Sequence, residues 1–190
     1  VITANQVVTM QVVYPSGNTS SCQFTVNVMD TIAPVLTAIP NDTIFLDANC
    51  QAIVPDYSTQ ANAQDNCSIQ SETQTPAAGT IITSTTTVTY SAVSNGQTTT
   101  ISFQLTPLDS ITPTVTCPAN ASVYADATCS YTLADYALTT VATDNCTSVL
   151  TTVQTPVAGT VISAVQTITY AVSDAAGNTT SCAFTLTPID

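Results

Sequence analysis

The sequence predicts an all-β fold, made of tandem β-sandwich repeats that disulfides hold together. Three observations lead to this prediction: apolar and polar residues alternate along many segments, one pattern recurs along the chain, and the chain contains seven cysteines. Alternation with a period of two residues is typical of strands that bury one face. No apolar stripe recurs at helical spacing over three turns, so we expect no long helix.

The recurring pattern becomes visible when the chain is aligned with itself. Asp65-Asn66-Cys67 matches Asp144-Asn145-Cys146, and Gly17–Thr25 matches Gly177–Thr185. Each repeat closes with an Asp and reopens with a Pro four residues later. This register predicts three parts, namely the C-terminal part of a truncated repeat at 1–30 and two complete repeats at 31–109 and 110–190.

Predicted strands alternate with turn signals in each part of the chain. In the last repeat the clearest strands are Thr167–Val172 and Ala183–Leu186, separated by the turn Ala175–Asn178. Several short strands in a repeat of this length favour a small sandwich with immunoglobulin-like Greek-key topology. The first part holds only the last two strands of a repeat, Gln6–Val13 and Cys22–Val28, so we expect that it does not fold alone. A strand-like run already starts at Val1, and we expect the chain to be a piece of something longer.

The repeats also predict how the cysteines pair. The last repeat has four cysteines, which allow three pairings. The middle repeat keeps only two of the four positions and has Ala38 and Ile101 at the others. Because these two cysteines are missing together, we predict that they form one pair. The predicted bridges are Cys50–Cys67, Cys129–Cys146 and Cys117–Cys182, with Cys22 bonded to a residue upstream of the chain.

The charge of the chain excludes several classes of function. It has no Lys, Arg or His and a formal net charge of −12, so its side chains form no salt bridges with one another. Nucleic-acid binding is excluded, because phosphates are held mainly by Lys and Arg. Cysteine-rich, acidic composition indicates an oxidising, extracellular setting. The alternative, a zinc site, would need Cys-x-x-Cys spacing or His. No apolar run approaches the ~20 residues of a membrane span, so this segment predicts no membrane insertion.

The same composition argues against catalysis. Ser and Thr are abundant, but the chain has no His or Lys to activate them. What remains is a carboxylate pair of the kind that hydrolyses glycosides, Asp56 with Asp65 or Asp135 with Asp144. Asp65 and Asp144 precede Asn-Cys in a turn signal, where Asp commonly bonds its own backbone. We therefore predict that the protein is not an enzyme.

Four Asp residues are candidate ligands for Ca²⁺. Asp30 and Asp109 lie at the ends of repeats, and Asp65 and Asp144 lie in loops that can reach a junction between repeats. Carboxylates and backbone carbonyls suit a hard cation. Because no Asp-x-Asp run exists, the alternative is that these are ordinary turn residues.

The residues of the last repeat resemble a known family. They include Thr-Pro…Cys-Pro-Ala-Asn, then Asp-Ala-Thr-Cys, Asp-Asn-Cys and Asp-Ala-Ala-Gly-Asn-Thr-Thr-Ser-Cys, which is similar to the pattern of HYR and HYR-like repeats. The resemblance extends over the whole chain, is strongest over Ser110–Asp190, and is closest to long Bacteroidota surface adhesins, including the gliding-motility adhesins. It implies immunoglobulin-like modules of an extracellular, cell-surface fibre that carry no catalytic residues.

The resemblance also implies candidate modification sites and a function. Three hydroxyl residues lie in the Asp-Ser/Thr-aliphatic motif of Bacteroidota O-glycosylation, namely Thr31, Thr43 and Ser110. The expected function is a structural and adhesive segment of a long fibre, with neighbouring repeats, surface glycans or other fibre chains as partners. The alternatives are a helical, pilus-like homopolymer with exchanged strands and a glycan-binding module. Tyr90 and Tyr170 occupy equivalent strand positions, where packing in the core is the expectation rather than sugar binding.

Overall fold

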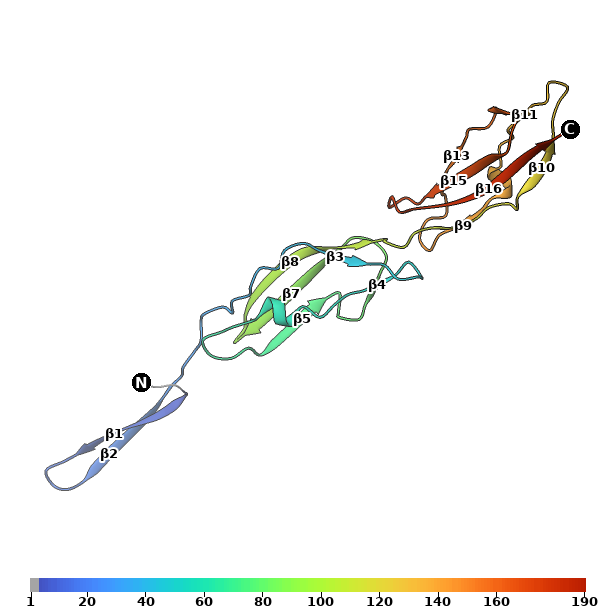
Figure 1. Cartoon of the computed structure of the whole chain (residues 1–190). Coiled ribbons are helices and arrows are strands. Elements are labelled where there is room, and N and C mark those ends of the chain that lie inside the picture. Colours follow the sequence, from blue (N-terminus) through green and yellow to red (C-terminus); the bar gives the residue numbers. More distant parts are fainter. Residues whose placement is uncertain (1–3) are drawn as a thin grey trace. The chain divides into compact units, whose positions relative to one another are not determined.

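The computed structural model describes residues 4–190, and nearly all of its regular secondary structure is β-strand (Figure 1). The strand-like run predicted to start at Val1 therefore falls partly on residues 1–3, outside the described residues. The chain forms two compact units. One comprises the residues up to Pro40 together with Pro55–Ala78 and Val88–Phe103, and the other comprises Asn41–Val54, Gly79–Thr87 and Gln104–Asp190.

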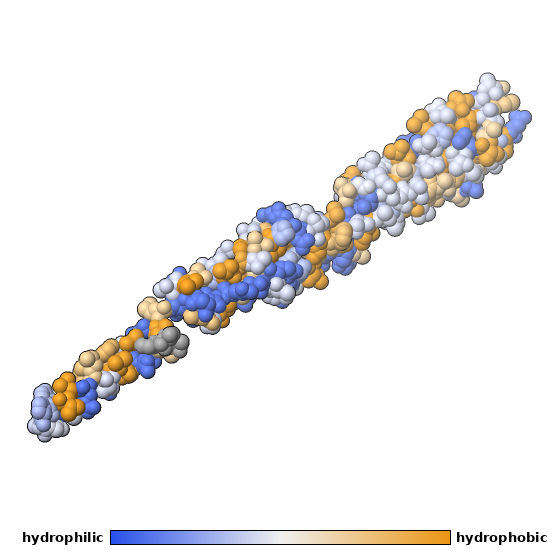
Figure 2. Space-filling model, turned by 60° about the vertical axis from the view of Figure 1, so that its left-hand side comes forward, coloured by the Kyte–Doolittle hydropathy of each residue, from blue (hydrophilic) through white to orange (hydrophobic). Residues whose placement is uncertain are grey.

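The first part of the chain is a two-stranded antiparallel hairpin. Its strands are β1 (Gln6–Val13) and β2 (Thr19–Val26), paired so that Val8 faces Phe24 and Met10 faces Cys22. Cross-strand partners share one face of a sheet, so these four residues form an apolar face. That face is open to solvent: the side chain of Met10 is 59% exposed and that of Phe24 is 49% exposed. Figure 2 shows apolar side chains on the surface of this hairpin.

The middle repeat contains a four-stranded sheet in the order β3-β8-β7-β5. The strands are β3 (Asp42–Phe45), β5 (Ser71–Thr75), β7 (Thr86–Ser94) and β8 (Gln97–Leu108). A small second sheet pairs β4 (Ala52–Ile53) with β6 (Ile81–Ile82), and the only α-helix of the described residues is the single turn α1 (Ser58–Ala61). Every second side chain of β7 is buried, which is the predicted alternation of a strand with one face in the core.

The last repeat has the same plan. Its four-stranded sheet has the order β10-β16-β15-β13, in which β10 runs parallel to β16 and the other pairs are antiparallel. These strands are β10 (Ala121–Tyr124), β13 (Thr151–Thr155), β15 (Gln166–Ser173) and β16 (Thr179–Ile189). The remaining elements are β9 (Thr114–Thr116), β11 (Tyr131–Thr132), β12 (Val141–Thr143), β14 (Val161–Ile162) and the 3-10 turn η1 (Ala137–Thr139). The predicted all-β, immunoglobulin-type sandwich fold is confirmed.

The core of the last repeat comes from the inward face of β15 and β16. Ile168 and Tyr170 on β15 pack with Phe184 and Leu186 on β16, and all four side chains are almost fully buried. Each such side chain contributes roughly 1.5–3 kcal/mol by leaving water. Tyr170 is in the core, as expected, and its equivalent Tyr90 is also buried. No helix among the described residues is long and apolar enough to cross a membrane.

Tyr170 combines an apolar ring with a polar end that is fully paired. Its hydroxyl lies 2.9 Å from both Asp135 Oδ1 and Gln154 Oε1 and donates its proton to these acceptors. Burial and the neighbouring Asp135 carboxylate raise the pKa of Tyr170 to about 12. The hydroxyl therefore stays protonated, and it links β15 to the loop that contains Asp135.

Two disulfides are present, and one of them overturns a prediction. Cys117 bonds Cys182 within the last repeat, which is the predicted pair. Cys50, however, bonds Cys146, and their Cα atoms are 5.0 Å apart. The predicted pairs Cys50–Cys67 and Cys129–Cys146 are therefore wrong, and Cys22, Cys67 and Cys129 have no disulfide partner among the described residues. The prediction that Cys22 bonds a residue upstream of the chain names a partner outside this sequence and stays a prediction.

The length of the sandwich explains why the predicted pairs do not form. Cys129 belongs to a turn next to the last residue of β16, because the preceding Ala125 N–H donates to the Ile189 carbonyl. Cys146 lies beside the turn at the other end of β16, where Ala175 N–H donates to Thr147 Oγ1. Strand β16 has 11 residues, about 35 Å at ~3.3 Å per residue. Because bonded cysteines need Cα atoms within about 7 Å, Cys129 and Cys146 cannot bond within one repeat.

Candidate metal centre

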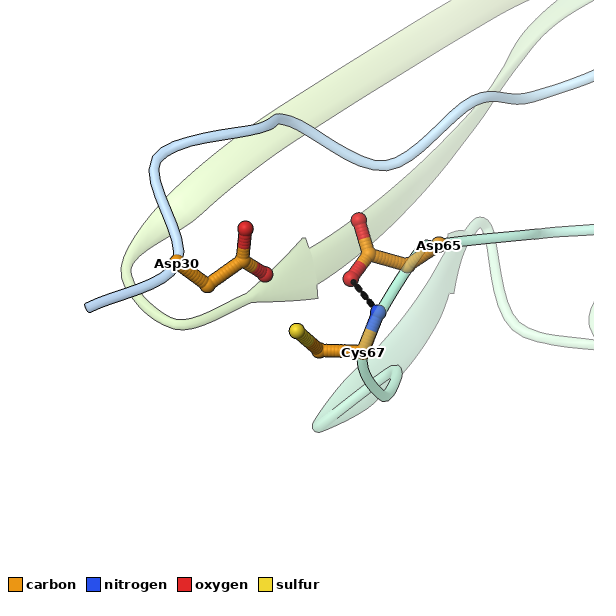
Figure 3. A group of neighbouring side chains, drawn as sticks. All are labelled: Asp30, Asp65 and Cys67. Atoms are coloured by element: carbon orange, nitrogen blue, oxygen red, sulfur yellow. Dashed lines mark hydrogen bonds between the residues drawn. The ribbon is translucent and has the colours of Figure 1, made fainter. Parts of the chain in front are cut away.

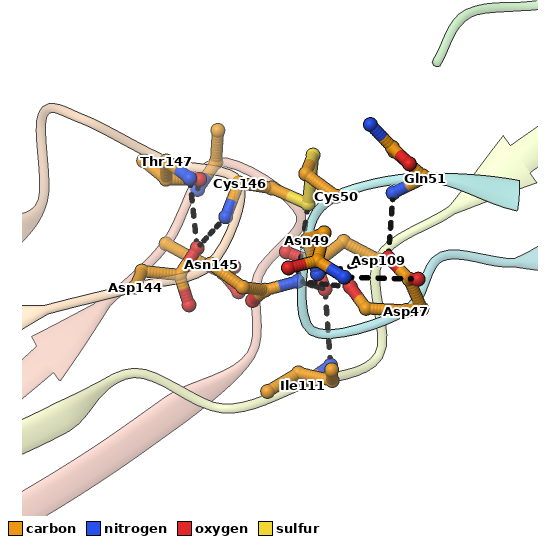
Figure 4. Close-up of a disulfide and its surroundings, with 12 residues drawn as sticks. Asp47, Asn49, Cys50, Gln51, Asp109, Ile111, Asp144, Asn145, Cys146 and Thr147 are labelled. Atoms are coloured by element: carbon orange, nitrogen blue, oxygen red, sulfur yellow. Dashed lines mark hydrogen bonds between the residues drawn. A yellow bond between two sulfur atoms is a disulfide. The ribbon is translucent and has the colours of Figure 1, made fainter. Parts of the chain in front are cut away.

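Three carboxylates of the second compact unit meet where three strands end. Asp109 follows the last residue of β8, Asp144 follows β12, and Asp174 follows β15. One carboxylate oxygen from each lies within 4.8 Å of the others. The site is well shielded, because Asp109 is only 8% exposed and Asp174 only 7% exposed. Figure 4 shows Asp109 and Asp144 from this cluster beside the Cys50–Cys146 bond.

Local turns fix these side chains in place. Asp144 Oδ2 accepts hydrogen bonds from the backbone N–H groups of Cys146 (3.0 Å) and Thr147 (2.8 Å). Asp109 Oδ1 accepts one from Ile111 N–H at 3.1 Å, and Asp174 Oδ1 accepts one from Asn178 N–H at 2.8 Å. Asp residues at the start of such turns bond the backbone two or more residues later. Asp109 and Asp144 therefore each have one oxygen engaged by their own loop, whereas Asp174 has both engaged, because Asn178 Nδ2 also donates to Asp174 Oδ2 at 2.8 Å.

Three other oxygens at the site are buried without a partner. Among the described residues, no donor reaches Asp109 Oδ2, Asp144 Oδ1 or Asn145 Oδ1. A buried polar atom that lacks its hydrogen bond costs about 1–3 kcal/mol, and more when the group is charged. The three carboxylates, two of them on buried residues, also repel one another, and the chain has no Lys, Arg or His to offset them. The donor set therefore fits a cation that the protein itself does not supply.

The chemistry of these donors is that of a calcium ligand set. Ca²⁺ prefers six to eight oxygen ligands from carboxylates, amide or backbone carbonyls, and water. Asp109, Asp144 and Asp174 offer carboxylates, and Asn145 offers an amide oxygen. Burial acts to raise the pKa of Asp174, but the hydrogen bonds from the Asn178 side chain and from the loop backbone outweigh it and lower the pKa below its ordinary value. Asp174 is therefore held in the charged form that binds a cation.

The middle repeat carries a related cluster that lacks one carboxylate. Asp30, Asp65 and Cys67 each offer one ligand atom within 4.8 Å of the others (Figure 3). The position equivalent to Asp174 is Ser94, whose hydroxyl donates to Asp65 Oδ2 at 2.8 Å. The same hydroxyl also lies 3.4 Å from Asp30 Oδ2, so a serine contacts both remaining carboxylates. Asp65 Oδ1 is still buried without a partner in the described part of the chain.

The acidic surroundings also affect the thiol of this cluster. A backbone hydrogen bond from Ile32, followed by bonds from neighbouring side chains, lowers the pKa of Asp30. Burial, together with the nearby charges of Asp30 and Asp65, raises the pKa of the Cys67 thiol. Cys67 is therefore protonated at neutral pH and is a weak nucleophile in this environment.

The structure thus brings the four predicted metal residues together as two pairs. Asp30 lies with Asp65, and Asp109 lies with Asp144. Sequence reasoning missed Asp174 and Asn145. Their signals were available, since Asp174 follows an alternating strand and Asn145 lies between Asp144 and a cysteine. The alternative catalytic residues Asp56 and Asp135 belong to neither cluster. The three candidate O-glycosylation residues, Thr31, Thr43 and Ser110, are all exposed.

Comparison with solved structures gives remote multi-domain matches. The structure of mouse clustered PcdhgC3 EC1-3 matches with 12% identity and a TM-score of 0.40, over 98% of this chain and 77% of that chain. Protocadherin Gamma C5 EC1-3 matches with 15% identity and a TM-score of 0.39, over 97% of this chain and 78% of that chain. PcdhgB3 EC1-4 matches with 13% identity and a TM-score of 0.38, over 98% and 58%, so the chain spans just over half of that structure.

Comparison by sequence identifies one domain. No curated protein matches the chain. The family model described as "HYR domain" matches residues 108–188, which include Asp109, Asp144 and Asp174 and all four cysteines of the last repeat. This part of the chain therefore matches an immunoglobulin-like domain of cell-surface proteins.

Proposed function

We propose that the chain is a structural and adhesive segment of an extracellular repeat fibre in which Ca²⁺ and disulfides hold successive sandwiches. The repeats are those at 31–109 and 110–190, preceded by the C-terminal part of another repeat at 1–30. The fibre resembles the long surface adhesins of the Bacteroidota, and Thr31, Thr43 and Ser110 are its proposed O-glycosylation sites. The HYR match supports an extracellular, adhesion-type module without catalytic function.

One observation carries the calcium part of this proposal. Buried carboxylate oxygens of Asp109 and Asp144 face the Asp174 site without a donor, in a chain that has no cationic side chain. A divalent cation satisfies these oxygens, offsets the repulsion among three negative charges, and ties together three loops. Asp109, Asp144, Asp174 and Asn145 would hold it. Water supplies the remaining ligands that Ca²⁺ requires.

Calorimetric titration of the metal-free chain with Ca²⁺ tests this proposal. We expect saturable binding and a higher melting temperature with Ca²⁺ than with a chelator. At a free Ca²⁺ concentration 100-fold above the Kd, the linkage relation gives about 2.7 kcal/mol of stabilisation. An unchanged melt, together with no bound metal by elemental analysis, would leave these residues as ordinary turn aspartates.

Two substitutions and a control make the test specific to the site. Asp174→Ser reproduces the Ser94 of the middle repeat, and Asp109→Asn removes one charge at nearly constant shape. Both should abolish most of the calcium-dependent shift in melting temperature. Asp190→Asn removes the same charge at an exposed position outside the cluster and should leave the shift intact. If all three variants lose the shift equally, net charge rather than the site is responsible.

The hairpin favours a second candidate, a strand-exchanged homopolymer. Its apolar face is exposed around Met10 and Phe24, whereas the equivalent Tyr170 and Phe184 are buried in the complete repeat. In an exchanged fibre this face would be covered by a different chain. Cross-linking the native assembly distinguishes the two candidates, because only the homopolymer places the Cys22 thiol against a cysteine of another chain.

A further inference from the structure

The Cys50–Cys146 disulfide shares a turn with two of the four proposed calcium ligands. Asp144 and Asn145 directly precede Cys146 in the chain. Asp144 Oδ2 accepts the backbone N–H of Cys146 at 3.0 Å, and Asn145 Nδ2 lies 3.2 Å from Cys146 Sγ. The other carboxylate oxygen of Asp144 and the amide oxygen of Asn145 are buried without a partner in the described part of the chain. Each of the two residues therefore contacts the cysteine with one polar atom and can offer the other to a cation.

The amide group of Asn145 also connects this turn to the turn that contains Cys50. The backbone carbonyl of Asp47 accepts two hydrogen bonds at 3.0 Å, one from Asn145 Nδ2 and one from Cys50 N–H (Figure 4). Asn145 Nδ2 lies 3.4 Å from Asp109 Oδ1 as well. In the flipped orientation the amide oxygen would face these two oxygens, so only the nitrogen suits this side of the amide. The orientation of the Asn145 ligand oxygen is therefore held by the carbonyl that closes the Cys50 turn.

The disulfide keeps these two turns together. The Cys50 turn has its own support, because Asp47 Oδ1 accepts the N–H groups of Asn49 (2.8 Å) and Gln51 (2.9 Å). With the bond intact, Asn145 is in place before a cation arrives, and such preorganisation reduces the cost of ordering that binding has to meet. Reduction removes the covalent link between the turns, so that the cation has to order its ligands itself.

We propose that Ca²⁺ at the candidate metal centre protects the Cys50–Cys146 disulfide from reduction, and that the disulfide in turn tightens the binding of Ca²⁺. The inference rests on the proposed calcium site and adds a redox regulation to it. Thermodynamic linkage makes the two effects equal. The factor by which the disulfide raises the affinity for Ca²⁺ is the factor by which saturating Ca²⁺ lowers the equilibrium constant for reduction.

The second disulfide of the chain provides an internal control. Cys117 and Cys182 do not adjoin a proposed calcium ligand in the sequence, and both pack against the core of the last repeat. Cys182 lies opposite Tyr170 on the neighbouring strand. Because this bond does not hold the ligand turns, Ca²⁺ should leave its reduction equilibrium unchanged.

Reduction by dithiothreitol, a small dithiol, is ordinary thiol–disulfide exchange. One dithiothreitol thiolate attacks a sulfur of the Cys50–Cys146 bond, which gives a mixed disulfide and releases one cysteine thiolate. The second dithiothreitol thiolate then displaces the other cysteine and closes the oxidised ring. Two electrons pass from dithiothreitol to the protein disulfide, and its two protons end on the two cysteine thiols.

The test uses the whole chain with Cys22→Ser, Cys67→Ser and Cys129→Ser, so that only the cysteines of the two disulfides remain. The metal-free chain is equilibrated with graded ratios of reduced to oxidised dithiothreitol, in either saturating Ca²⁺ or a chelator. Thiols are then alkylated, and peptide mass spectrometry measures how much of each disulfide is reduced. The same chain with Asp109→Asn serves as the variant without the site, and with Asp190→Asn as the control of equal charge.

Calcium binding is measured in parallel by calorimetry, on this chain and on a variant that also carries Cys50→Ser and Cys146→Ser. Ca²⁺ should raise the ratio of reduced to oxidised dithiothreitol that half-reduces Cys50–Cys146 by about 5-fold to 150-fold, the usual range for coupled sites. The Kd for Ca²⁺ of the variant without this disulfide should be higher by the same factor. Asp109→Asn should abolish the protection, and Asp190→Asn should retain it.

The outcomes separate this inference from the calcium site itself. If calorimetry shows Ca²⁺ binding but the reduction of Cys50–Cys146 does not change, the coupling is refuted and the site stands. Equal protection of Cys117–Cys182 would also overturn the coupling, because it would reflect a general stabilisation of the repeat. Absence of Ca²⁺ binding in the chain with both disulfides would refute the site and, with it, this inference.

Discussion

Removing the Cys117–Cys182 bond should destabilise the last repeat by an amount that its loop length sets. The bond joins residues 65 positions apart, for which the loop-entropy relation gives about 4 kcal/mol. The middle repeat shows which residues suit these positions without a bond, since it has Ala38 and Ile101 there. Replacing Cys117→Ala and Cys182→Ile therefore removes the cross-link while keeping apolar side chains beside the core.

The assay is thermal unfolding followed by calorimetry, without reductant, so that Cys50–Cys146 stays intact. A change of 1 kcal/mol shifts the melting temperature of a domain of this size by roughly 4–8 °C. The double variant should therefore melt about 20 °C lower in the transition of the last repeat. Cys67→Ser, which replaces a free and exposed thiol, should shift nothing.

A loss below about 1 kcal/mol would refute this reasoning. It would mean that the bond hardly restricts the unfolded chain, and the entropic account would then be wrong for this protein. A large shift in the Cys67→Ser control would instead attribute the change to thiol chemistry in solution.

Three further predictions concern burial and ionisation. Phe184→Ala should lower the free energy of unfolding, measured in urea, by about 3–5 kcal/mol. Phe24→Ala, at the equivalent but exposed position, should lower it by less than about 0.5 kcal/mol. Equal losses would show that the hairpin face is covered in solution. Burial and carboxylate neighbours raise the pKa of Tyr90 and Tyr170 to about 12. The contribution of these tyrosines to the free energy of unfolding should therefore be full below pH ~10 and fall as pH rises to ~12, in step with tyrosinate absorbance. A free energy of unfolding that does not change over this pH range would contradict the prediction. Backbone hydrogen bonds lower the pKa of Asp47 and Asp56. The contribution of these two carboxylates to the free energy of unfolding should therefore be present above pH ~4 and be lost below it, as measured by unfolding at a series of acid pH values. Asp47→Asn should reduce the loss of stability below pH ~4.

Much of the fold was predicted from the alternation of apolar and polar residues and from the repeated sequence pattern. The hairpin strand β1 has the predicted bounds, and β15 and β16 contain the predicted strands. The single-turn helix α1 was not predicted, because four residues leave no periodic pattern to read. The two short helical turns after Tyr57 and Tyr136 are held by tertiary contacts instead, since the backbone N–H of each tyrosine donates to a glutamine side chain of a distant strand.

The disulfide error has a specific cause. The repeat shows that the positions of Cys50 and Cys67 occur together in every complete repeat, but a bond within a repeat and a bond between repeats predict that same pattern. Strand length distinguishes them, and the sequence did not reveal that β16 would extend over 11 residues as one strand. The candidate metal site was half predicted for a similar reason: Asp109 and Asp144 repeat as Asp30 and Asp65, whereas Asp174 is replaced by Ser94 and so left no repeated signal.

The two disulfides also determine how the chain responds to mechanical tension. Cys50–Cys146 and Cys117–Cys182 are two cross-links, and three stretches of backbone connect one cross-link to the other. The shortest stretch, from Cys117 to Cys146, is 29 residues long. Tension on the chain can therefore separate the two cross-links by only about 100 Å, at ~3.4 Å per residue. The unbridged backbone from Cys50 to Cys182 covers 132 residues and would extend about 450 Å at the same rise. Most of the backbone between Cys50 and Cys182 is thus hidden length that force cannot extend while both disulfides remain, and a reducing environment would make this part of the chain far more extensible.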